Sequence, residues 1–288
     1  MRITGDMATF IITRLTFLEA VRRKIALAAF LLGVAFLILY GLGFYFITRE
    51  ATFGNLASPT EQLFRNQAYG FLANAGLYAV NFLTLAMGAL VSADTLAGEI
   101  DSGTIQALVT KPVRRAEIVF GKWLGFASLL AVYLLLMGGG VILLVFLLSG
   151  YRVPNPLAGM GIVYLESLLF MTITLLCSSV ISTLATGGTV FGLYGVAFIG
   201  GWVEQFGSLL KNQTAMNVGI LSSLIMPSEA LFRRAAYEMT SPAARALGIS
   251  FGPSFVVSLP STAMIVYAAV YLVAALALAV RQFAQRDL

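Results

Sequence analysis

Residues 92–125, SADTLAGEIDSGTIQALVTKPVRRAEIVFGKWLG, gather charged side chains between two long apolar runs of the chain. Gly103 allows a helix to end, and Thr104 can cap the helix that follows. Pro112 stops that second helix, because it lacks an amide hydrogen and disfavours helix in the residue before it. The stretch therefore predicts a helical hairpin over residues 94–122 with a short helix at its tip.

The predicted tip carries apolar side chains that would be exposed, namely Ile105, Leu108 and Val109. Such a surface suits docking to another protein. Because the hairpin leads directly into an apolar run on each side, a push at its tip would act on both runs at once.

The composition indicates an all-α integral membrane protein. Of the 288 residues, 59% are hydrophobic and only 11% are charged, whereas a soluble domain carries about 25% charged residues. There is no histidine, and the single cysteine, Cys177, lies in an apolar run. This excludes a disulfide, a metal site built from Cys and His, and a histidine general base, and we assign no catalytic or metal-binding residue. The net charge of +5 fits the surplus of Lys and Arg on cytoplasmic loops and requires no nucleic acid.

The apolar runs are each long enough to cross a hydrocarbon layer of about 30 Å. Six spans are expected, at about 25–47, 71–93, 123–149, 160–184, 188–206 and 261–281. The first is too long for a signal peptide and is read as a retained span. Spans four and five are separated only by ATGG, residues 185–188, which predicts a tight turn. No internal repeat is visible, so a single membrane domain over residues 1–288 is expected.

The distribution of Lys and Arg predicts that both termini lie in the cytoplasm, since the segments that would then be cytoplasmic carry the larger share. The apolar face of residues 10–25 predicts an interfacial elbow helix within residues 1–24, the alternative being an ordinary basic flank of the first span. Residues 207–260 are expected outside, with an amphipathic helix over 226–239 that forms a surface helix or a re-entrant hairpin.

Polar residues at membrane depth indicate either function or packing. The fourth span carries hydroxyl groups on about half of its circumference, and these either line a translocation path or bond their own helix and pack. They are Thr172, Thr174, Ser178, Ser179 and Ser182. The role of Asn81 in the second span is undecided between the same two alternatives. For Glu166 we favour a carboxylate that reaches the outer interface over one that acts in gating or substrate binding. Gly188, Gly192 and Gly200 predict a face of close helix contact.

A longer set of residues in the hairpin resembles the signature of ABC-2 type permeases, the membrane subunits of ABC exporters. The matching residues are Glu99, Gly103, Thr104, Leu108, Lys111, Pro112, Val113, Arg115, Glu117, Ile118, Gly121 and Lys122. The nearest branch resembles the permease group of nitrous-oxide-reductase maturation. Arg114 departs from the pattern, because the family often has serine there.

The resemblance implies a half-transporter. Two copies of this chain, or this chain and a related permease, would form the membrane core in the cytoplasmic membrane. Two separate ATP-binding subunits would hold ATP and Mg²⁺, each receiving residues 104–113 as a coupling helix. The implied coupling residues are Glu99, Gly103, Thr104, Ile105, Leu108, Lys111, Pro112, Arg115, Glu117 and Lys122. The chain has no phosphate-binding loop of its own, so we expect it not to be an enzyme.

Other interpretations of the same residues remain open at this point. Glu99 could be a solvated carboxylate that pairs with Lys111 or Arg115. The whole chain could be a secondary transporter or channel, with Glu166 and Asn81 as its intramembrane polar groups, or a subunit that transmits force without transporting anything. An intramembrane enzyme is disfavoured, because the sequence has neither a histidine pair nor an Asp-rich run.

Overall fold

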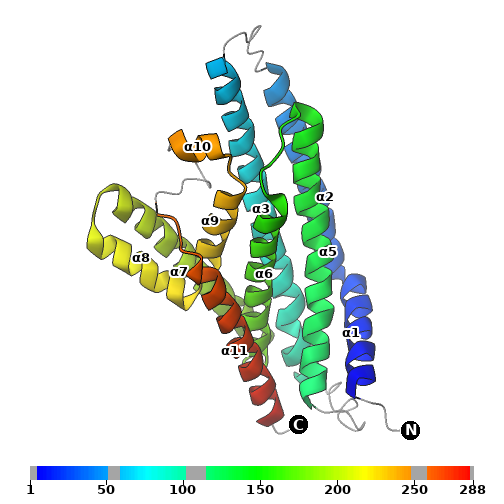
Figure 1. Ribbon diagram of the computed structural model, residues 1–288. Helices are drawn as coiled ribbons and strands as arrows, with labels where there is room; N and C mark the ends of the chain where they lie inside the picture. Colours follow the sequence, from blue (N-terminus) through cyan, green and yellow to red (C-terminus); the bar gives the residue numbers. More distant parts are fainter. Residues whose placement is uncertain (1–4, 51–58, 102–114, 248–257, 286–288) are drawn as a thin grey trace.

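The computed structural model describes residues 5–50, 59–101, 115–247 and 258–285, and every regular element in these ranges is an α-helix. Six helices are long and apolar enough to cross a membrane. They are α2 (Lys24–Glu50), α3 (Pro59–Asp101), α5 (Arg115–Ser149), α6 (Pro156–Ser178), α7 (Thr183–Leu209) and α11 (Ala263–Gln285). This confirms the expectation of an all-α integral membrane protein with about six spans (Figure 1).

The helices that flank the predicted hairpin are much longer than a bilayer requires. The 43 residues of α3 correspond to about 64 Å at 1.5 Å per residue, against about 30 Å of hydrocarbon. At one end of the bundle α1 (Gly5–Arg22) begins, α3 ends, α5 begins and α11 ends (Figure 1). The two arms of the hairpin and both ends of the described chain therefore lie on the same side of the molecule.

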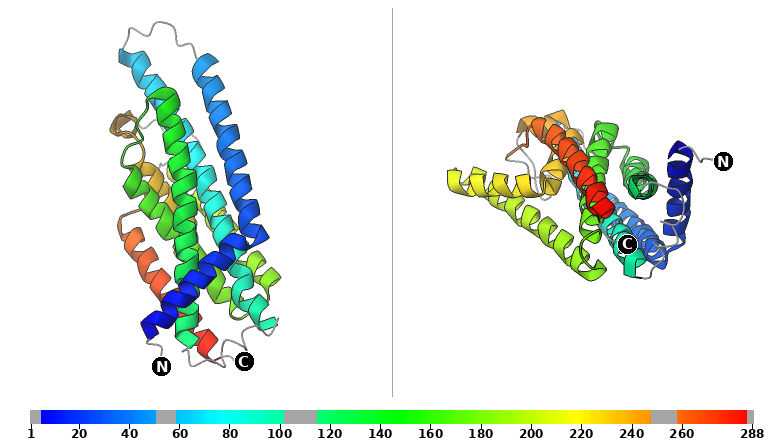
Figure 2. Two further views of the ribbon diagram at one scale, coloured as in Figure 1. Left: turned by 90° about the vertical axis from the view of Figure 1, so that its right-hand side faces the viewer. Right: turned by 90° about the horizontal axis from the view of Figure 1, so that it is seen from below.

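The elbow region is two helices separated by one residue. α1 ends at Arg22 and α2 begins at Lys24, and α1 crosses α5 obliquely at the end of the bundle (Figure 2). Gly121 and Gly125 of α5 allow this contact, because a Cβ atom at either position would collide with Ile12 or Thr16 of α1.

One helix extends beyond its predicted span, and one predicted connection is wrong. α3 begins at Pro59, before the span predicted from about residue 71, since its first turns are polar and add nothing to an apolar run. The turn between spans four and five lies at residues 179–182 rather than 185–188. Ser182 is extended and precedes α7, and the Thr186 amide already donates to the Ser182 carbonyl at 2.8 Å. The glycines at 187 and 188 therefore belong to the helix.

The region predicted as an outer loop is a folded part of the bundle. α8 (Gln213–Ile225) packs back along α7, and the pair leans away from the other helices (Figures 1 and 2). The chain then bends by 100°, and α9 (Ser228–Glu238) packs against α6 and α7 before α10 (Pro242–Leu247). A helix resting on the membrane surface is thus incorrect for α9, which buries Phe232 and even Arg233. The bend fits a broken span as well as the predicted re-entrant hairpin.

The predicted glycine face of α7 is only partly a contact face. A Cβ atom at Gly200 would collide with the Ser222 side chain of α8, whereas one at Gly188 or Gly192 meets nothing within 4 Å among the described residues. Gly219 of α8 also lies against the Glu204 Cβ atom of α7. Gly207 of α7 lies against Ala215 of α8 beside the connecting turn, so close approach joins the two helices along the length of α8.

Candidate functional site

A polar junction links the elbow to the inner ends of the spans. Arg23, at the break between α1 and α2, donates to Glu19 at 2.8 Å and to Asp94 of α3 at 3.4 Å. Asp94 also accepts a hydrogen bond of 3.2 Å from Thr183, the first residue of α7. One carboxylate of α3 thus contacts both the elbow and the start of α7.

The junction is half open to solvent, and its ion pairs are correspondingly weak. The Asp94 side chain is 48% exposed and that of Arg23 is 23% exposed. Pairs in such surroundings contribute about 0–1 kcal/mol. These contacts can therefore exchange without a large change in the free energy of unfolding.

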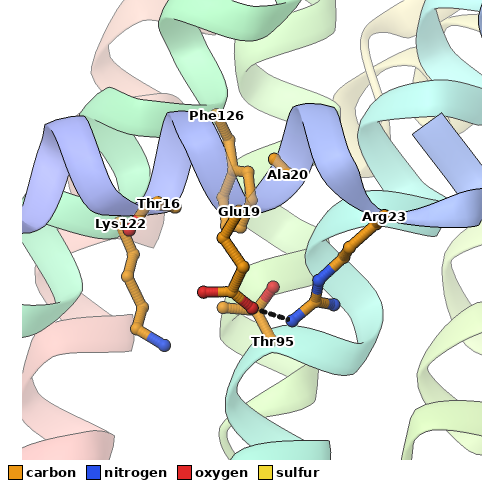
Figure 3. Close-up of a pocket in the computed structure, with 7 residues that line it drawn as sticks. All are labelled: Thr16, Glu19, Ala20, Arg23, Thr95, Lys122 and Phe126. Atoms are coloured by element: carbon orange, nitrogen blue, oxygen red, sulfur yellow. Dashed lines mark hydrogen bonds and ion pairs between the residues drawn. The ribbon is translucent and has the colours of Figure 1, made fainter. Parts of the chain in front are cut away.

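Lys122 lies beneath the elbow helix. Figure 3 shows its side chain beside those of Glu19, Arg23 and Thr95, around a cavity of about 10 Å³, which has room for about one water molecule. Because α1 covers α5 here, Lys122 is only 4% exposed. The sequence placed it at the membrane interface as a coupling residue, and its burial means that any part it takes in coupling is indirect.

The other coupling residues divide into a described and an undescribed group. Arg115, at the start of α5, donates to the carbonyl of Ala284 near the end of α11 at 3.1 Å, and Glu117 is half-buried in the first turn of α5. Outside the described residues lie Gly103, Thr104, Ile105, Leu108, Lys111 and Pro112, together with the side chain of Glu99 in the last turn of α3. The structure therefore joins the outgoing arm of the hairpin to the C-terminal helix.

A second polar contact lies inside the bundle. The Asn81 side-chain amide of α3 donates to Glu166 of α6 at 3.2 Å, and both residues are essentially fully buried. The prediction that Glu166 reaches the outer interface is wrong, because α3, α5, α9 and α11 all pack around α6. Asn81 Oδ1 and Glu166 Oε2 have no hydrogen-bond partner among the described residues.

The hydroxyl groups of α6 favour the packing interpretation. Each of four bonds a carbonyl of the preceding turn at 2.6–3.0 Å, namely Thr172, Thr174, Ser178 and Ser179. The Trp123 indole of α5 also donates to Thr172 at 2.8 Å. Ser182 is not part of this helix, and its side chain is exposed at the turn before α7.

The sequence analysis missed a buried ion pair between α7 and α9, away from the junction with the elbow. Arg233 of α9 donates to Glu204 of α7 at 2.7 Å, with only 3% and 6% of the two side chains exposed. Ser258 completes the set, because its hydroxyl donates to Glu204 at 2.6 Å and its carbonyl accepts from Arg233 at 3.3 Å. The available signal was Glu204, an ionisable residue in the last turn of the span predicted at 188–206. Because the predicted span ends just beyond it, Glu204 is interpreted from the sequence as a residue at the membrane boundary, and no local pattern points to a partner for it.

The described residues thus place a pair of long helices, joined by residues 102–114, at a junction with the elbow, α7 and α11. The sequence of residues 10–288 matches the family model of the ABC-2 family transporter proteins. The chain belongs to this family. A search among curated proteins finds no match.

Family membership confirms the resemblance that residues of the hairpin predicted. An ABC-2 family protein is a membrane component of a transporter, which agrees with the six candidate spans. The assignment to the branch of nitrous-oxide-reductase maturation stays a prediction.

Proposed function

We propose that this ABC-2 family protein is the permease subunit of an ATP-driven exporter. Two copies, or one copy and a related permease, would form the membrane core, and two ATP-binding subunits would supply ATP and Mg²⁺ chemistry. The observation that carries the proposal is that α3 and α5 run as unbroken helices from the hairpin into the core of a chain matched by the family along nearly its whole length.

The contacts of these arms offer a route for force. A displacement of the hairpin would move the last turns of α3 and the first turns of α5 together. α5 would carry α1 with it through the close contacts at Gly121 and Gly125, and α3 would act on α7 through Asp94 and Thr183. A two-state tilt of this kind is a common way to open a path on alternate sides.

We further propose that the end of the bundle with the hairpin arms faces the cytoplasm. The surplus of Lys and Arg on the predicted inner segments supports this orientation. For the second copy of the chain, α7 offers an outer face at Gly188 and Gly192 that no described residue of the same chain covers.

Co-purification tests the proposal. The tagged chain is expressed with a candidate ATP-binding subunit, as wild type and as the double variant Glu99→Lys, Leu108→Asp. A stoichiometric complex that is lost in the variant supports docking at the hairpin. The matched control is Gln62→Lys, Leu63→Asp, which makes similar changes at exposed positions of the other end of α3 and should keep the complex.

Two results would count against the proposal. One is a wild-type chain that inserts and folds but binds no ATP-binding subunit. The other is ion flux through the isolated chain without nucleotide, which would favour a channel or secondary transporter that uses the buried pair of Asn81 and Glu166.

A further inference from the structure

The buried contact between α3 and α6 leaves two oxygen atoms without a partner. The Asn81 amide donates to Glu166 Oε1 at 3.2 Å, and the exposed fractions of the two residues are 1% and 0%. Asn81 Oδ1 and Glu166 Oε2 have no hydrogen-bond partner among the described residues. A carboxylate and an amide carbonyl can only accept hydrogen bonds. An ionised Glu166 would therefore leave both oxygens unsatisfied inside the bundle.

The surroundings of Glu166 offer no positive charge to an ionised carboxylate. Glu166 forms no ion pair within the described part of the chain, where α5 and α11 add no charged group beside it. The titratable groups that act on it from the other packed helices are Tyr78 of α3, Tyr194 of α7 and Glu229 of α9. Arg233 of α9 is engaged by Glu204 at 2.7 Å. An unpaired charge at membrane depth is costly, and the second carboxylate of Glu229 adds repulsion.

One proton on Glu166 Oε2 would satisfy both oxygens. They are the remaining polar atoms of two planar groups that one hydrogen bond already joins. The carboxyl group would donate to Asn81 Oδ1 while its other oxygen accepts from the Asn81 amide, as a carboxylic acid pairs with a primary amide. The two groups supply too few oxygens for a metal ion, and the described residues contain no cluster of three acidic, Cys or His side chains that could hold one. A proton is the ligand that fits.

We propose that Glu166 is a proton-binding site in the membrane core, and that its bound proton joins α6 to α3 through a second hydrogen bond with Asn81. The site does not depend on an ATP-binding subunit. Release of the proton would remove that bond and leave a charge near Glu229, so α3 and α6 would separate more readily. Since α3 is an arm of the hairpin in the proposed function, proton release and movement of this arm would then be linked.

Infrared difference spectroscopy detects the proton directly, because the carbonyl stretch of a protonated carboxyl group lies apart from the bands of a carboxylate. The full-length chain in detergent at neutral pH is measured as wild type and as Glu166→Gln, whose amide can donate in place of the carboxyl hydrogen. The difference between the two spectra should contain the band of a protonated acid. The matched control is Glu61→Gln at an exposed position of α3, which should change carboxylate bands only.

Two results of this measurement would overturn the proposal. One is a carboxylate signal for Glu166, which would show that it is ionised. The other is a protonated band that Glu229→Gln removes and Glu166→Gln leaves, which would place the proton on α9.

Exchange of the two groups tests the pairing with Asn81. The double variant Asn81→Asp, Glu166→Gln puts the acid on α3 and the amide on α6 with unchanged side-chain lengths, so one proton can again join them. We expect it to keep a protonated band and an unfolding midpoint near that of the wild type. A double variant with carboxylate bands only would overturn the pairing.

A single variant keeps this test decisive if the double variant does not fold. Asn81→Leu removes both partners of the carboxyl group, so the band of Glu166 should shift toward that of an acid without hydrogen bonds. An unchanged band would overturn the bond to Asn81.

Sodium separates a proton site from a site for a metal cation. Replacing sodium chloride by choline chloride at the same ionic strength should leave the protonated band of the wild type unchanged. A band that appears only without sodium would assign the Glu166 carboxylate to a metal cation and overturn the proposal.

Discussion

The two ends of α7 are held in opposite ways. Its first residue, Thr183, touches Asp94 in a half-exposed junction with the elbow. Near its other end, Glu204 forms a buried ion pair with Arg233 and a hydrogen bond with Ser258. Partners of the first kind can be exchanged at small cost, whereas those of the second kind cannot separate without leaving a charge buried. The first end is suited to movement and the second to anchoring α9.

The largest effect is expected from breaking the anchor. Arg233→Ala leaves Glu204 charged and buried, so the free energy of unfolding should fall by about 3–5 kcal/mol. Thermal unfolding of the purified protein in detergent measures the loss. The double variant Arg233→Met, Glu204→Leu removes both charges and should be more stable than the single variant. A double variant that is less stable than Arg233→Ala would show that the ion pair itself, rather than the unpaired charge, dominates.

The close contact of α7 with α8 should be the next most sensitive feature. Gly200→Val places side-chain atoms where the Ser222 side chain lies, and such overpacking costs about 1–3 kcal/mol. Gly192→Val is the matched control on the same helix, because its Cβ atom would meet nothing within 4 Å. In the monomeric protein the unfolding midpoint should fall for Gly200→Val alone, and equal loss in the two monomeric variants would contradict the contact assigned to Gly200. A loss in Gly192→Val that is seen only in the dimer is expected if the second copy packs against the open face of α7.

Loss of the buried hydrogen bond between Asn81 and Glu166 should lower the free energy of unfolding by as much as Gly200→Val or by less. Asn81→Ala removes the donor to Glu166 and should lower the free energy of unfolding by about 1–3 kcal/mol, because a buried polar group then lacks a partner. Glu166→Gln keeps an acceptor of the same shape and should cost less. Chemical unfolding of the two variants in detergent provides the comparison. If Glu166→Gln is the more damaging change, the carboxylate has a partner that the amide cannot replace.

Hydropathy predicted the membrane-spanning helices. It did not predict features that depend on contacts between residues far apart in the sequence. The apolar runs in the sequence located all six candidate spans, whereas the hairpin tip predicted from the glycine and proline pattern lies outside the described residues and stays a prediction. The polar first turns of α3 were missed, because an apolar run does not report a helix that continues into water. Burial of Arg233 depends on Glu204, 29 positions earlier in the chain, and no local pattern reports such a pairing.

The smallest effect on stability should come from the junction. Asp94→Ala removes the contacts to Arg23 and Thr183, yet the free energy of unfolding should change by no more than about 1 kcal/mol, because the carboxylate is half exposed. Glu238→Ala is the control, since it removes the similar 2.6 Å pair with Arg234 at a distance from the elbow. The proposed ATP-driven function adds a second expectation: in a complex with an ATP-binding subunit, Asp94→Ala should uncouple ATP hydrolysis from transport, while Glu238→Ala should not. The distinction between the two ends of α7 fails if Asp94→Ala destabilises the chain as strongly as Arg233→Ala, because the junction would then be an anchor too.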